Sequence, residues 1–122
     1  MALPGGQEFL SGGSSVSRIV SAAASTNATS AKTLAGVLHR ALGFNAAGAT
    51  RYLKFYDKAS APTVGTDTPV LTIAVPATSA FDLELKLPFY TGIAYAMTTG
   101  SADNDTGALT AADILGLNII YS

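Results

Sequence analysis

The chain contains a single histidine, His39, and no cysteine, so the side chains that most often carry nucleophilic or metal chemistry are scarce. A catalytic histidine needs a nucleophile or a carboxylate beside it, and the segment Val37 to Ala41 supplies neither. A zinc site needs several His, Cys or carboxylate ligands at close spacing. We therefore predict that the protein is not an enzyme and has no cofactor and no metal centre. His39 is expected to lie in a strand at a surface or interface.

Two carboxylates, Asp103 and Asp105, have the i, i+2 spacing of calcium ligands in a short stretch of Asp, Asn, Thr and Gly. An EF-hand loop would continue with a third side-chain ligand where Gly107 stands, a glycine where Ala108 stands, and a glutamate at its end. Asn, Asp and Gly also form turns through local hydrogen bonds with the backbone. We expect a turn at this place and not a calcium site.

Charged residues are few for a chain of this length. They make up 12 % of the 122 residues, which is half of the usual share of about 25 %. The net charge is −1 and 48 % of the residues are apolar. A charge close to zero promotes association, so we expect a homo-oligomer or docking on a larger assembly. The seven basic residues are interleaved with acids, which argues against nucleic acid as a partner.

The start of the chain shows no basic segment followed by an apolar stretch. No window approaches the ~18 continuous apolar residues of a membrane-spanning helix. We therefore expect neither a signal peptide nor a membrane partner.

The first 30 residues differ in composition from the rest, because they are mostly Ala, Gly, Ser and Thr and only two are charged. We interpret residues 1–30 as an N-terminal arm that could include a first strand, and residues 31–122 as the folded domain. Leu3, Phe9 and Leu10 are the candidate anchors of this arm on a neighbouring protein, since a free tail would leave their apolar area in water. The alternative is a terminus without fixed contacts.

Alternation of apolar and polar residues dominates the rest of the chain. From Phe81 to Leu87 every second residue is apolar, which predicts a strand with one buried face and one solvated face. We expect Pro88 to end this strand. Further candidate strands, separated by turns rich in Gly, Pro, Asn and Asp, lie at residues 16–20, 34–42, 51–57, 70–75, 92–99 and 114–121.

This pattern predicts an all-β fold with six or seven short strands, namely a single antiparallel β-sandwich that resembles a jelly roll and carries an extended N-terminal arm. The last strand, residues 114–121, is apolar on both faces apart from Gly116 and Asn118. A strand of this kind at an open sheet edge would promote aggregation. We therefore expect it to be central in its sheet or covered by another subunit.

Two stretches of the chain resemble a known group of proteins. They run from Arg51 to Val70, beginning R-Y-L-K-F-Y-D-K-A, and from Gly92 to Gly107, beginning G-I-A-Y-A-M-T-T-G. They resemble small virion proteins of tailed bacteriophages, and the resemblance covers roughly residues 32–121. The shared motifs mark strands and turns, so no functional residue is carried over. Small β-sandwich proteins of this kind are similar to head decoration, or cement, proteins.

The resemblance implies a bacteriophage capsid decoration protein that binds the assembled head and stabilises contacts between major capsid subunits. Its expected partners are the major capsid protein and further copies of this chain, in a trimer. Its expected location is the capsid surface of the virion, after synthesis in the host cytoplasm. The alternative is a tail or fibre module that binds a host surface glycan through exposed tyrosines. A cluster of Tyr90, Asp103, Asn104 and Asp105 at one loop-rich end would favour that alternative.

Overall fold

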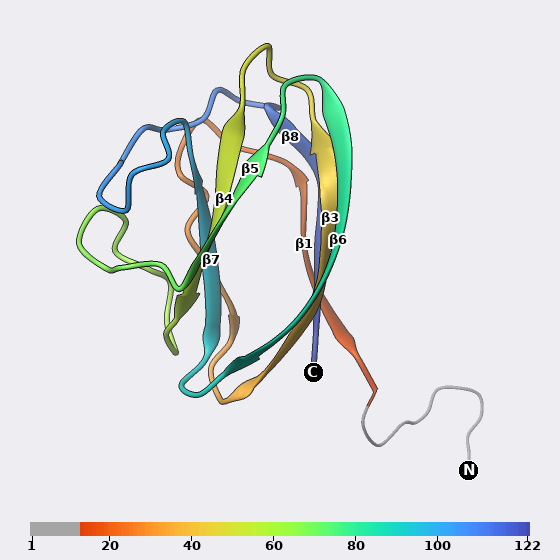
Figure 1. Ribbon diagram of the computed structural model, residues 1–122, viewed down its shortest axis with the longest axis vertical. Coiled ribbons are helices and arrows are strands. Elements are labelled where there is room, and N and C mark those ends of the chain that lie inside the picture. Colours follow the sequence, from red (N-terminus) through yellow and green to blue (C-terminus); the bar gives the residue numbers. More distant parts are fainter. Residues whose placement is uncertain (1–12) are drawn as a thin grey trace.

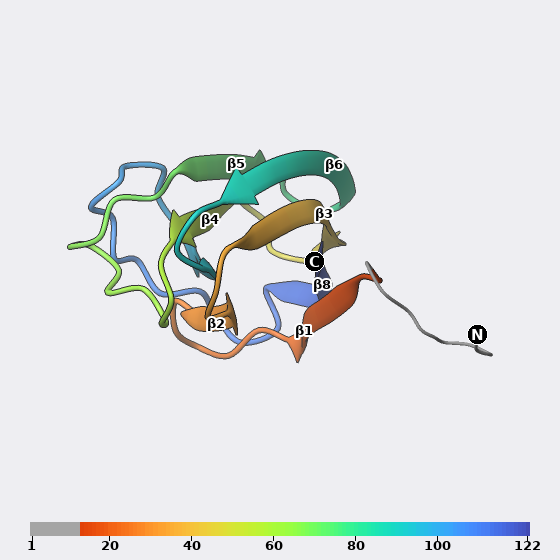
Figure 2. The same ribbon diagram turned by 90° about the horizontal axis from the view of Figure 1, so that it is seen from below.

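The computed structural model describes residues 13–122, and within this range the chain forms eight β-strands and no helix. Two four-stranded antiparallel sheets pack face to face, as Figure 1 and Figure 2 show. Their strand orders are β1-β8-β3-β6, here the first sheet, and β2-β7-β4-β5, here the second sheet. The strands are β1 (Ser15–Ser21), β2 (Thr29–Lys32), β3 (Gly36–Asn45), β4 (Arg51–Asp57), β5 (Leu71–Val75), β6 (Ser79–Phe89), β7 (Ile93–Thr98) and β8 (Ile114–Tyr121).

The pairing of the strands follows a simple rule. β1 pairs with β8, β2 with β7, β3 with β6 and β4 with β5, all antiparallel. The chain is thus a long hairpin whose successive strand pairs alternate between the two sheets, which is the jelly-roll arrangement. The expected β-sandwich is confirmed, with eight strands in place of the six or seven predicted. Across the described residues, no helix has the length and apolar character needed to cross a membrane.

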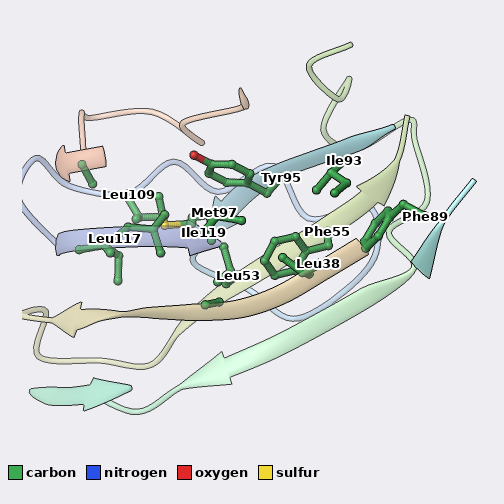
Figure 3. Close-up of a cluster of buried hydrophobic side chains, with 13 residues drawn as sticks. Leu38, Leu53, Phe55, Phe89, Ile93, Tyr95, Met97, Leu109, Leu117 and Ile119 are labelled. Carbon is green, nitrogen blue, oxygen red and sulfur yellow. The ribbon is translucent and has the colours of Figure 1, made fainter. Parts of the chain in front are cut away.

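The apolar last strand, β8, lies between β1 and β3, so the expectation that it is central in its sheet is confirmed. Its inward side chains, Leu117 and Ile119, are fully buried between the sheets. They meet inward residues of the second sheet, among them Leu53, Phe55 and Met97, in one continuous core (Figure 3). Ser17 of β1 and Tyr95 of β7 join the two sheets through a hydrogen bond between their hydroxyl groups, at 2.8 Å. Burial of this core supplies the main favourable term in folding.

The strand predicted at Phe81 to Leu87 is confirmed as part of β6, whose side chains alternate between half-buried and exposed. It is an edge strand, and two of its residues face the single residue His39 of β3 in a β-bulge. Lys86 lies in this bulge, with a positive φ of 50°. A bulge on an edge strand disrupts the edge and hinders pairing with another chain.

The expectation that Pro88 ends this strand was wrong, because β6 continues to Phe89. Pro88 faces Val37 of β3, and the backbone N–H and C=O of Val37 bond to Ser122 on the other side. The nitrogen of Pro88 therefore points away from β3, towards the open edge, where its missing N–H costs no ladder hydrogen bond.

The N-terminal region contributes two strands. β1 corresponds to the candidate strand at residues 16–20 and is an edge of the first sheet. β2 is an edge of the second sheet. β2 was not predicted, because Thr29 to Lys32 is short and shows no alternation of apolar and polar residues. The candidate anchors Leu3, Phe9 and Leu10 lie outside the described residues.

The turn between β6 and β7 is held by one carboxylate. Asp57, at the end of β4, accepts hydrogen bonds from the backbone N–H groups of Tyr90, Thr91 and Gly92. Partial burial acts to raise the pKa of Asp57, but the three N–H donors outweigh burial, so the pKa lies below the ordinary value of 3.8. The ionised form therefore stabilises the fold above pH 3.8, and this stabilisation is lost as the pH falls below that value towards the folded pKa.

An Asp57→Asn variant is expected to be less stable than the wild type at about pH 7 and to lose less stability between about pH 7 and pH 3, because the titrating group is gone. Urea unfolding of both proteins at the two pH values measures this difference. An equal loss in the variant and the wild type would contradict the role given to Asp57.

Candidate protein-interaction surface

The outer face of the second sheet is covered by the chain itself. Figure 1 shows the β4–β5 and β7–β8 loops folded over this side of the sandwich. Beneath them lie the outward side chains of β4 and β7, of which Lys54, Tyr56, Ala94, Ala96 and Thr98 are all buried. Val64 of the first loop packs on Tyr56 and the two alanines. Because Ala94 and Ala96 are small, the loops can approach the sheet closely, and they cover the outer face of its two central strands.

Lys54 fastens the β7–β8 loop to the sheet. Its ammonium group donates a hydrogen bond to the backbone carbonyl of Ala102, at 2.5 Å. Burial lowers the pKa of Lys54, and the nearby Asp105 and Asp103 act in the opposite direction. The hydroxyl of Tyr56 is buried and has no hydrogen-bond partner among the described residues. The bond of Lys54 to Ala102 thus holds the loop against the outer face of β4.

The segment considered as a calcium loop is a turn organised by Asp105. Its carboxylate accepts hydrogen bonds from the backbone N–H groups of Gly107, at 2.8 Å, and Gly100, at 3.3 Å. Asp103 and Asn104 are exposed on the same loop. Within the described residues, no group of three or more His, Cys, Asp or Glu side chains could hold a metal ion.

His39 lies in β3, where its Nε2 atom is 2.8 Å from the hydroxyl oxygen of Ser122. It is half-buried, in a strand as the sequence predicted. The contact joins β3 to the C-terminal residue, next to the β3–β8 pairing.

The five tyrosines do not share one surface. Tyr95 points into the core and Tyr56 lies under the loops, so both are buried, while Tyr52 and Tyr121 are half-buried. Tyr90 is 79 % exposed and precedes β7, whereas Asp103, Asn104 and Asp105 follow that strand. In the range 13–122, no hydrogen bond joins Tyr90 to that loop; its backbone N–H binds Asp57.

The outer face of the first sheet is the one broad face that residues 13–122 leave uncovered, and no segment of that range lies over it in Figure 2. The register of the strands brings apolar side chains together on it. Val16 of β1 faces Ile120 of β8, and Phe44 of β3 faces Leu115 of β8. We call this set the outer apolar face, and its members are Val16, Val20, Leu42, Phe44, Leu115 and Ile120.

The exposure of this face is large for apolar residues. Val16 is 55 % exposed, Val20 64 %, and Phe44 and Leu115 37 % each, while Leu42 and Ile120 are half-buried. Single exposed apolar residues are common, but a contiguous exposed apolar patch marks a site of interaction with another protein or a similar surface. This patch extends over three adjacent strands, so it is a candidate interaction surface.

The charged residues on the two sides of the outer apolar face differ in sign. Arg18 of β1 lies on one side, and Asp82 and Glu84 of β6 lie on the other. Asp82 accepts two hydrogen bonds from the guanidinium of Arg40, at 2.6 and 2.8 Å, and this bond lowers the pKa of Asp82. Within the described residues Arg18 forms no ion pair, and the ion pair of Glu84 is with Lys86, at 3.8 Å.

Part of this surface was predictable from the sequence. Residues 114–121 are apolar on both faces, which predicted that this strand would be central in its sheet or covered by another subunit. The contribution of Phe44 was missed, because the predicted strand ended at Leu42, two residues before it. The signal was the continued alternation in Leu42-Gly43-Phe44-Asn45.

Comparison with known proteins finds no matching family model, no matching curated protein and no matching solved structure.

Proposed function

We propose that this protein is a structural component of a bacteriophage particle, which binds the assembled head and stabilises the contacts between major capsid subunits. The observation that carries the proposal is the outer apolar face. A protein that acted alone would be expected to cover such a patch with charged side chains, whereas a subunit of an assembly buries it against other proteins. The resemblance of residues 32–121 to small phage virion proteins points in the same direction.

The mechanism would be stabilisation by mass action. A protein that binds the assembled shell, and not the free capsid subunit, shifts the equilibrium towards the assembled state by an amount that grows with its concentration. Such a function needs a rigid domain and contact surfaces, and no catalytic group. The N-terminal anchors Leu3, Phe9 and Leu10 are proposed to bind the capsid, and the sandwich to associate with further copies of the chain.

The test is binding of the purified full-length protein to mature phage heads that lack it, measured by co-sedimentation. We expect saturable binding and an increased thermal stability of the heads. Deletion of residues 1–13 should weaken binding at least tenfold while the domain stays folded, because β1 begins only at Ser15.

A matched pair of variants separates the anchors from the rest of the arm. Phe9→Ala is expected to weaken head binding, and Gln7→Ala, which removes a polar side chain from the same segment, is expected to leave it unchanged. If the protein does not bind heads but binds host surface polysaccharide, the proposal is overturned in favour of the tail or fibre module.

A further inference from the structure

We infer that the outer apolar face binds the same face of a second copy of this chain, in a dimer with two-fold symmetry and not in the trimer that the resemblance implies. The inference rests on the self-association in the proposed function and not on capsid binding. A two-fold interface needs a surface that is complementary to itself. The outer face of the first sheet has this property, because Arg18 lies on the β1 side and Asp82 and Glu84 lie on the β6 side. The residues between them are apolar except for Asn118 and for Arg40, whose guanidinium is bound by Asp82.

The strand register shows how two copies would match. Across the sheet, one row contains Val16, Ile120, Arg40 and Glu84, and the next contains Arg18, Asn118, Leu42 and Asp82. With a two-fold axis parallel to the strands, β1 of one copy lies over β6 of the other, and β8 lies over β3. Each row then faces the same row of the second copy. Sheets packed in this way keep their strands within about 30° of one another.

In this arrangement the charges are complementary. Arg18 of one copy lies opposite Asp82 and close to Glu84 of the other, and the pair occurs twice in the dimer. Leu115 faces Phe44 of the second copy, so the apolar centres meet. The other in-plane two-fold axis, perpendicular to the strands, would place Arg18 against Arg18, and like charges in direct contact disfavour that axis.

The remaining charges on the face fit the same pairing. Arg40 would lie opposite Ile120, but its guanidinium is already bound by Asp82, so the hydrocarbon part of the side chain can pack on the isoleucine. Lys86 follows Glu84 on β6, lies in the bulge and is 74 % exposed, so it remains solvated at the rim of the interface.

The size of the face predicts a moderate affinity. Four strands ~4.8 Å apart and about seven residues at ~3.3 Å each present roughly 400 Å² per copy. This is about half of the ~800 Å² per partner in a standard stable complex. We therefore expect the dimer to form in the micromolar concentration range.

Sedimentation equilibrium of the full-length protein between about 1 and 500 µM tests the pairing. Val16→Glu places a carboxylate opposite Glu84 of the second copy and is expected to raise the dissociation constant at least tenfold. Val70→Glu is the matched control, since Val70 is 56 % exposed against 55 % for Val16 and lies outside the first sheet. The control is expected to keep the dissociation constant within twofold of the wild-type value.

A charge reversal tests the register. Val16→Glu alone should weaken the dimer, and the double variant Val16→Glu with Glu84→Lys, which places a lysine opposite the new carboxylate, should restore the dissociation constant to within about threefold of the wild type. Circular dichroism and thermal melting confirm that each variant is folded. A wild-type monomer at all concentrations, a trimer, an unaffected Val16→Glu variant, or a double variant that fails to recover would each overturn the inference. Head binding by a monomer would leave the proposed function in place.

Discussion

Replacement of Leu117 by alanine is expected to lower the free energy of unfolding by about 2–5 kcal/mol. Leu117 is fully buried in β8, the strand between β1 and β3, and it packs in the core that joins the two sheets. Because its neighbours belong to paired strands, they can close the resulting cavity only in part. A loss of this size is a large fraction of the 5–15 kcal/mol that stabilises a typical domain.

Leu34→Ala is the matched control, since it removes the same atoms from a side chain that is 70 % exposed. We expect its effect to stay within about 0.5 kcal/mol, as for most surface substitutions. Urea unfolding at a protein concentration well below that of dimer formation measures both variants. Similar losses in the two variants would contradict the placement of Leu117 in the core.

Replacement of Gly92 by alanine is expected to destabilise the fold by about 3 kcal/mol or more. A Cβ atom at this position would lie 2.5 Å from the carbonyl oxygen of Lys58, 2.7 Å from the Cα of Ala59 and 2.7 Å from the carbonyl oxygen of Lys32. All three are backbone atoms from two other segments, so no side-chain rotation can relieve the contact. The strands that meet at this end of the second sheet would have to move apart.

Gly48 provides the control for this prediction, because a Cβ atom there would have nothing within 4 Å. We expect Gly48→Ala to change the free energy of unfolding by less than about 1 kcal/mol. Urea unfolding or limited proteolysis compares the stabilities of the two variants. A Gly92→Ala variant as stable as Gly48→Ala would show that the backbone around residue 92 is not held as closely as described.

The fold was largely predictable because most strands have one apolar and one polar face. Residues 51–57 and 81–87 were placed correctly from alternation alone. The exceptions have physical reasons. β2 is too short to show a pattern, and Pro88 is tolerated because it lies on an edge strand. Alternation also cannot tell that the outer side of β7 is buried, since the loops that cover Ala94 and Ala96 come from distant segments.

The candidate interaction surface was predictable only in part. The sequence indicated that β8 would be apolar on both faces, but the identity of its neighbours depends on the pairing of strands far apart in the chain. Phe44 meets Leu115 across more than 70 residues of sequence. Alternation within one strand shows which residues share a face, whereas the composition of a patch spread over several strands is set by sheet topology.

The pairing of β1 with β8 also determines how the domain responds to mechanical force. A pull along the chain from its N-terminal side enters the described fold at Ser15, which faces Tyr121 at the same end of β8. The hydrogen bonds between two antiparallel strands are perpendicular to the strands, so a pull parallel to β1 loads them together in shear, whereas a pull that separates Ser15 from Tyr121 opens them one after another from that end. The hydroxyl contact of Ser17 with Tyr95 passes part of the tension to the second sheet. A domain tethered through this strand would therefore resist tension along the strand better than tension directed across it.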